Sequence, residues 1–214
     1  DGVTQRKPIC TSPDEIIFFS LHYNAPRGFY SYNLESQKTH KIAEANAVSD
    51  YNIDYDRAAN SILFSEYDAS LLYSSAFKTE LKRIDFDTNK QFEITKKDRV
   101  FSPTISGSNI IALQTDGANV NIISIDGNNT HRLLTSVKKG TPISIKANPA
   151  SPDQLALIMN KRGVQGLWIT TPQTIAQDVN QAPRVAFKNA SIFDLDWHPS
   201  EQKLLFTADE SPAM

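Results

Sequence analysis

The sequence is poor in three features, and each shortage excludes a class of protein. It has one cysteine, so no disulfide can form within the chain, and a zinc site built mainly from cysteine is excluded. It has no run that approaches the roughly 20 apolar residues of a membrane-spanning helix, so we expect no span in this chain. It has no excess of positive charge, because 22 lysines and arginines face 24 aspartates and glutamates. We therefore expect no direct nucleic-acid binding, which depends on a basic surface.

Residue patterns typical of catalysis are missing as well. The sequence has no Gly-x-Ser-x-Gly segment of a serine hydrolase, and its eight glycines form no phosphate-binding loop. The four histidines, His22, His40, His131 and His198, lack the spacing of metal ligands. We interpret Cys10 as a small buried residue, since no neighbouring residue would activate it as a nucleophile. The sequence thus predicts no catalytic residue, no metal and no cofactor.

What the sequence does contain is a repeat of short, β-rich apolar runs. Its 214 residues are 40% hydrophobic and 21% charged, which is the composition of a folded globular domain. The runs begin at Ile16, Ile62, Ile110, Leu155 and Leu204. The intervals between them are 46, 48, 45 and 49 residues, close to the roughly 40–50 residues of a four-stranded propeller blade. We expect the five runs to form equivalent second strands of successive blades.

The residues around each run supply the other strands of the unit. Pairs of apolar residues eight positions apart, with polar turn residues between them, occur at Leu34 and Ile42, Phe86 and Ile94, and Ile125 and Leu133. This spacing predicts three hairpins with one register. Ahead of two runs, residues 52–56 and 194–198 match each other at an offset of 142. They predict the first strand, in which Tyr55 and Trp197 are core residues between blades.

Together these strands predict an all-β fold, a β-propeller of four-stranded antiparallel blades. The repeats cover approximately residues 6–45, 49–97, 100–137, 140–189 and 192–214. The last repeat supplies only two strands, so about four and a half blades are present. We interpret residues 1–214 as a single, incomplete propeller domain, and we expect missing blades or flanking domains in the full-length protein.

Several segments resemble the repeat of the TolB-type (WD-like) β-propeller family. Residues 121–135, NIISIDGNNTHRLLT, are similar to the second half of that repeat, and residues 11–15, 150–153 and 196–200 are similar to its Trp-Ser-Pro-Asp-Gly turn. The copies are imperfect, because Glu15 stands where the family has glycine. The resemblance implies a six-bladed propeller. It also implies a place in periplasmic protein complexes, in sensor regions or beside catalytic domains, since such a scaffold does not fix one activity.

The loops of one propeller face are the candidate partner-binding site. Loops from second to third strands emerge on the same face as the connections between blades, and loops on a rigid scaffold commonly carry function. The loop over residues 68–79 is long and apolar, so it either covers its own blade or the channel, or contacts a partner. We predict that a protein or peptide docks on this face. The predicted contact residues are Leu71, Leu72, Tyr73, Phe77, Arg27, Lys138, Lys139, Lys161 and Arg162.

Two pairs of aspartates on the predicted first strands could hold a hard cation. Asp54 and Asp56 correspond to Asp194 and Asp196, and alternate residues of a strand point to one face. No glycine-containing calcium loop follows either pair. We therefore favour a role in hydrogen bonds to turn amides.

The leading hypothesis from the sequence is a non-catalytic binding or sensing propeller of a bacterial envelope protein, located in the periplasm. One version resembles TolB itself, and another resembles the periplasmic sensor part of a membrane-bound winged-helix regulator of the CadC type. The alternative is the gating propeller of a prolyl-oligopeptidase-like hydrolase whose catalytic domain lies outside this chain. The flanking gene sequence would separate the three, because each predicts a different neighbouring domain.

Overall fold

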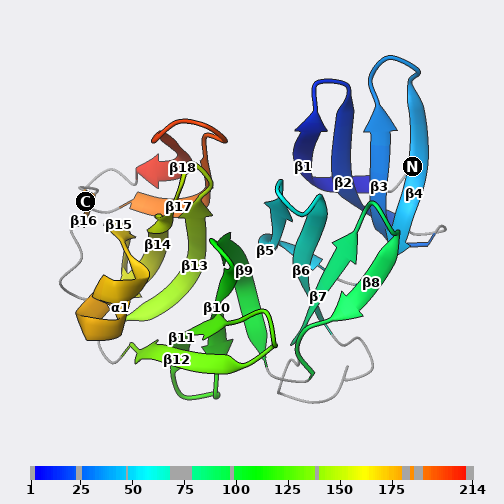
Figure 1. The fold of residues 1–214 in the computed structure, drawn as a ribbon. Coiled ribbons are helices and arrows are strands. Elements are labelled where there is room, and N and C mark those ends of the chain that lie inside the picture. The colour runs from blue at the N-terminus through cyan, green and yellow to red at the C-terminus, as the bar shows by residue number, and fades with distance from the viewer. Residues whose placement is uncertain are drawn as a thin grey trace. The chain divides into compact units, whose positions relative to one another are not determined.

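The computed structural model describes residues 3–22, 26–46, 48–67, 79–96, 99–137, 140–179, 184–185 and 190–210. These residues form four four-stranded sheets and one two-stranded sheet, all antiparallel, in which the strands follow one another in chain order (Figure 1). By its internal contacts the chain divides into two units, Asp1–Asp98 and Arg99–Met214.

The first unit holds two sheets. The first sheet consists of β1 (Val3–Ser12), β2 (Glu15–His22), β3 (Gly28–Asn33) and β4 (Lys38–Glu44). The second sheet consists of β5 (Val48–Asp56), β6 (Ser61–Tyr67), β7 (Thr79–Asp85) and β8 (Lys90–Glu93).

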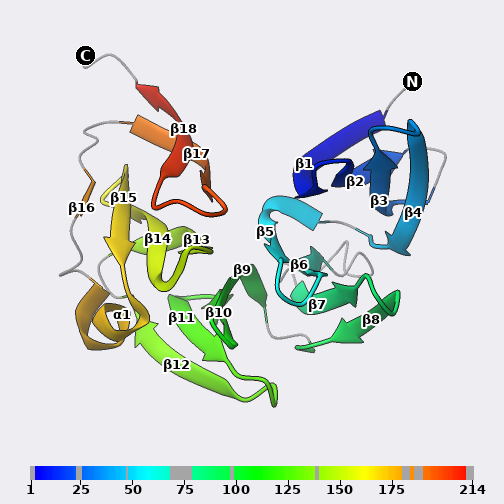
Figure 2. The same cartoon turned by 45° about the horizontal axis from the view of Figure 1, so that its top comes forward.

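The second unit holds three sheets and one short helix (Figure 2). The first sheet consists of β9 (Val100–Ser106), β10 (Asn109–Thr115), β11 (Val120–Ile125) and β12 (His131–Ser136). The next consists of β13 (Thr141–Asn148), β14 (Ser151–Lys161), β15 (Val164–Thr170) and β16 (Arg184–Val185), with α1 (Pro172–Asp178) between the last two strands. The last sheet consists of β17 (Ala190–Trp197) and β18 (Leu204–Glu210).

The five apolar runs of the sequence form the second strand of five different sheets, as predicted. They lie in β2, β6, β10, β14 and β18. The predicted first strands are confirmed as well, since residues 52–56 lie in β5 and residues 194–197 in β17. The period of the sequence therefore corresponds to one antiparallel sheet.

Aromatic side chains join the two sheets of the first unit. Period-2 alternation directs Ile17 and Phe19 of β2 to one face of their sheet, where both are buried. Phe29 of β3 packs edge-on between Phe19 and Phe64 of β6, with ring centroids 5.3 Å and 4.9 Å away. These side chains belong to one core that spans both sheets.

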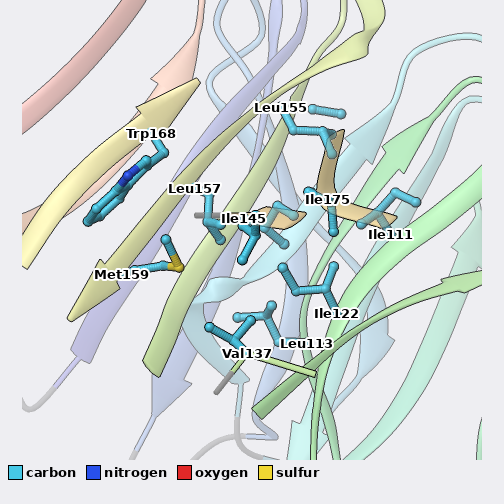
Figure 3. Close-up of a cluster of buried hydrophobic side chains, with 12 residues drawn as sticks. Ile111, Leu113, Ile122, Val137, Ile145, Leu155, Leu157, Met159, Trp168 and Ile175 are labelled. Atoms are coloured by element: carbon cyan, nitrogen blue, oxygen red, sulfur yellow. The ribbon is translucent and has the colours of Figure 1, made fainter. Parts of the chain in front are cut away.

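In the second unit the sheet β13–β16 is buried on both faces by its neighbours. Leu157 and Met159 of β14 face one core, shown with Trp168 in Figure 3, while Ala156 and Ile158 of the same strand face another. Such a strand needs a continuous apolar run rather than alternation, and this is what the sequence contains at residues 155–159.

Side chains also bond to the backbone of the next sheet in this unit. Ser102 and Thr104 of β9 accept hydrogen bonds from the backbone N–H groups of Ile145 and Ala147 in β13, at 3.0 and 2.8 Å. Trp197 of β17 donates its indole N–H to a β13 carbonyl oxygen at 3.1 Å. Trp197 therefore packs between sheets, as the sequence indicated.

Helix α1 is an element that the sequence did not predict. Thr171 caps it by accepting a hydrogen bond from the N–H of Thr174 at 3.1 Å, and Pro172 occupies its first turn. Ile175 is buried in the core between the sheets β9–β12 and β13–β16. Seven residues are too few to give a helical period, so only the Thr-Pro start was visible in the sequence.

The prediction of three identical hairpins is correct for two of them. Four-residue turns separate β3 from β4 and β7 from β8, whereas five residues separate β11 from β12. Each turn is closed by a side chain that accepts backbone N–H groups. Asn33 and Asp85 are the last residues of their strands, whereas Asp126 is the first residue of its turn. The first two precede Leu34 and Phe86, which consequently lie in turns, but Asp126 follows Ile125, which stays in its strand.

The prediction that Cys10 is buried is wrong. Cys10 is an exposed free thiol on β1. Its neighbour Ile9 packs toward the core of the first unit, and alternation along the strand directs the next side chain away from it.

Candidate functional site

A pocket of about 540 Å³ opens between two sheets of the second unit, at one end of their strands. Its walls come from the β10–β11 hairpin, the β14–β15 hairpin and the connection from β12 to β13. We call this end of the second unit the loop face. The residues that line the pocket are Thr115, Gly117, Ala118, Asn119, Val120, Val137, Gly140, Thr141, Asn160 and Arg162.

The first wall of the pocket is a turn that closes on its own polar groups. Asp116 accepts hydrogen bonds from the N–H groups of Ala118 and Asn119, both at 2.8 Å. The bonds from Asn119 and Ala118 stabilise the charged carboxylate and lower the pKa of Asp116. Thr115 adds a bond from its hydroxyl to the carbonyl oxygen of Asn119, at 3.2 Å. Gly117 adopts φ +97°, which favours glycine.

The second wall joins the β14–β15 turn to the segment before β13. The side chain of Asn160 accepts a hydrogen bond from the N–H of Gly163 at 2.9 Å, and this bond closes the turn that carries Arg162. Gly140 lies against this wall, since an added Cβ would be 3.1 Å from the carbonyl oxygen of Asn160. A side chain at position 140 would therefore press on the backbone of this wall.

The structure describes three of the nine predicted contact residues. Arg162 lines the pocket and is exposed. Lys161 is half-buried, and its ammonium group lies 5.6 Å from the ring centre of Trp168, so its charge is directed to the indole. Arg27 is exposed in the first unit, before β3. The predicted residues Leu71, Leu72, Tyr73, Phe77, Lys138 and Lys139 lie outside the described residues.

Sequence reasoning pointed to both hairpins of the pocket but missed part of its lining. Val120, Val137 and Thr141 were not predicted, because they belong to strand ends or directly flank a strand and carry no unusual pattern. The available signal was Gly140, a glycine directly before a strand.

The first unit has a buried ion pair at the corresponding end of its strands. Glu66 of β6 and Lys82 of β7 form this pair, and Glu66 also accepts a hydrogen bond from the backbone N–H of Asn46, between β4 and β5. Burial by itself lowers the pKa of Lys82, but the bond to Glu66 and the charges of Glu66, Glu80 and Glu93 outweigh it, so the pKa is raised. The pair thus connects β6 and β7 to the segment between β4 and β5.

Three of the four aspartates of the predicted first strands accept backbone N–H groups. Asp56 accepts hydrogen bonds from the N–H groups of Ala58 and Ala59, at 3.1 and 3.0 Å, and so closes a turn. Asp194 and Asp196 each accept the N–H of the following residue. Within the described part of the chain, no group of three or more histidine, cysteine or acidic side chains is placed to hold a metal ion.

A second pocket, of about 470 Å³, lies on the first sheet of the first unit. Ile16, Phe18 and Tyr32 contribute its apolar part, and Phe18 stacks on Tyr30 with ring centres 6.1 Å apart. This is the face opposite to the one that packs on the second sheet.

No family model and no curated protein matches this chain. Solved structures do: it is similar to TolB from Acinetobacter baumannii, with a TM-score of 0.61 and 16% identity over 86% of this chain and 43% of that one. A protein described as TolB from Agrobacterium tumefaciens gives 0.72 and 13%, over 98% of this chain and 72% of that one. Pyrococcus horikoshii acylaminoacyl peptidase gives 0.55 and 12%, over 96% and 42%.

These similarities establish the fold class. The chain has an all-β propeller fold, and its described residues form four four-stranded antiparallel blades and two strands of a further blade. It spans less than half the length of the Acinetobacter and Pyrococcus proteins. Over the residues described, no helix is long and apolar enough to cross a membrane.

Proposed function

We propose that this chain is a non-catalytic propeller of a bacterial envelope protein that binds a protein or peptide partner through its loop face on the periplasmic side. The observation that carries the proposal is the pocket, where two hairpins and an inter-sheet connection converge. Similarity to two TolB structures supports a binding role. Because the chain spans 43% of one of them, we also propose that it forms part of a six-bladed propeller.

The chemistry of the pocket supports binding rather than catalysis. Its described lining contains no histidine, cysteine, lysine or carboxylate, so it offers no pair of groups for acid–base or nucleophilic work. Its side-chain hydrogen-bond acceptors are already engaged in closing turns, as at Thr115 and Asn160. What faces the open space is a set of uncharged polar groups and one guanidinium.

A second candidate function is the gating propeller of a prolyl-oligopeptidase-like hydrolase. Similarity to acylaminoacyl peptidase and to a prolyl endopeptidase favours it. The gene sequence beside this segment distinguishes the candidates, because a hydrolase would encode a Gly-x-Ser-x-Gly segment there. The version with a winged-helix regulator of the CadC type stays a prediction from the sequence, and would require a DNA-binding domain and a membrane span upstream.

Replacement of Leu72 and Phe77 by serine tests a separate part of the proposal, the apolar contacts predicted from the sequence in the first unit. We expect the double variant to retain less of the partner that wild-type protein captures from an envelope extract, because apolar anchors dominate most protein interfaces. The melting temperature should stay unchanged. Leu133→Ser, at a side chain that is 56% exposed on β12, is the matched control and should leave capture intact. Unfolding of the double variant would instead show that the two side chains are core, and would refute their role in docking.

A further inference from the structure

The described residues that line the pocket on the loop face carry charge of one sign, which is positive. Arg162 is the charged residue of its described lining, and no carboxylate among the described residues forms an ion pair with it. The remaining lining residues are uncharged, namely glycines, threonines, asparagines, valines and an alanine. A second cation stands beside the first wall, since a Cβ added at Gly117 would be 3.3 Å from a guanidinium nitrogen of Arg99.

The carboxylate nearest to the pocket in the sequence already accepts hydrogen bonds from its own turn. Asp116 follows the lining residue Thr115, but one of its carboxylate oxygens accepts both the Ala118 and the Asn119 N–H. The carboxylate keeps its charge, and both bonds hold it against the backbone of its own turn. Two more cations, Lys138 and Lys139, stand in the sequence between the lining residues Val137 and Gly140.

We infer that the pocket binds a carboxylate of an acidic peptide, with Arg162 as the recognition residue. This inference rests on the proposed function and specifies the partner's chemistry. A guanidinium donates two parallel hydrogen bonds to a carboxylate, which gives orientation as well as affinity. Asn160 closes the turn between β14 and β15, and Arg162 adopts φ +55° in that turn. The backbone of Arg162 is therefore held in a defined conformation. Asn119 and Thr141 also line this pocket.

The test is a fluorescence-polarisation titration with a labelled octapeptide of alternating glutamate and leucine. A second peptide carries glutamine in place of each glutamate, and an amidated version of each separates side-chain carboxylates from the C-terminus. We expect the glutamate peptide to bind more tightly, with an affinity that falls as salt is added. Arg162→Gln should weaken binding about 10- to 100-fold, the cost of losing a hydrogen-bonded charge pair.

Arg132→Gln is the matched control. Arg132 is exposed in the same unit, on β12 beside the β11–β12 turn, at the opposite end of the strands. It should bind the glutamate peptide as the wild type does. Equal affinity for both peptides would overturn the inference while leaving a peptide-binding loop face in place. Equal losses in the two arginine variants, or no binding of the glutamate peptide, would also overturn it.

Discussion

Replacing Phe29 with alanine is expected to lower the free energy of unfolding of the first unit by about 3–5 kcal/mol, the usual cost of removing a buried phenylalanine side chain. Phe29 is 1% exposed and touches aromatic rings from both sheets. Its loss leaves a cavity at the contact between the sheets and removes two edge-to-face pairs. Urea denaturation followed by intrinsic fluorescence or circular dichroism measures the effect.

Phe92→Ala is the control for this substitution. Phe92 lies on β8 of the same unit and is 48% exposed, so its truncation should change stability by no more than about 0.5 kcal/mol. If both variants lose the same stability, Phe29 does not connect the sheets as described.

Replacing Glu66 with glutamine should cost about 2 kcal/mol, because it removes the charged partner of the partly buried Lys82 ammonium group and leaves it only the longer contact to Glu80. The amide oxygen of the glutamine can still accept the N–H of Asn46, so the lost stability reports the removal of the charge. The double variant Glu66→Gln/Lys82→Met should recover most of the stability, since both charges of the pair are removed and Glu80, which loses its contact to Lys82, has a side chain that reaches solvent. Glu44→Gln, in an exposed pair with Lys41, should have no effect.

The same pair predicts how stability responds to alkaline pH. The pKa of Lys82 in the folded protein lies above its ordinary value of 10.5. Its contribution is therefore complete below that value and is lost as pH rises through the higher pKa of the folded state. Wild-type protein should lose this part of its stability above about pH 10.5, whereas Lys82→Met should not. Loss of the Lys82 contribution at neutral pH would contradict the assignment.

The strand framework was predictable because each strand carries its own signal. The apolar runs at β2, β6, β10, β14 and β18 had to be second strands once their period matched one blade. The turns were less predictable. In the second hairpin Asp85 closes the turn, and the apolar residue Phe86 follows it and lies in the turn. In the third hairpin Asp126 closes the turn, and the apolar residue Ile125 precedes it and lies in the strand.

The features that escaped prediction depend on contacts between distant segments. Helix α1 is stabilised by burial of Ile175 against strands from two sheets, which no local pattern encodes. Cys10 is exposed because alternation on β1 favours Ile9 as the inward residue.

The candidate site was predictable only as a set of loops. The order of strands fixes which hairpins share an end, and so points to residues 115–118 and 160–165. The approach of Gly140 to Asn160 follows from the pairing of β13 with β14, in which Thr141 is opposite Asn160. The pocket itself depends on the packing of two sheets, which no local pattern encodes. The charge of Arg162 could be assigned to the site from sequence, but the engagement of Lys161 with Trp168 could not.

Site-specific photo-crosslinking of the full-length protein in its native cells tests the central claim, that the partner docks on the loop face. Asn119 and Asn128 form a matched pair, since both are exposed and both stand in turns closed by an aspartate. They lie at opposite ends of β11. A benzophenone amino acid at position 119 should give a covalent adduct with another protein, and the same group at position 128 should give none. Adducts from position 128 alone, equal adducts from both, or none from either would contradict the account.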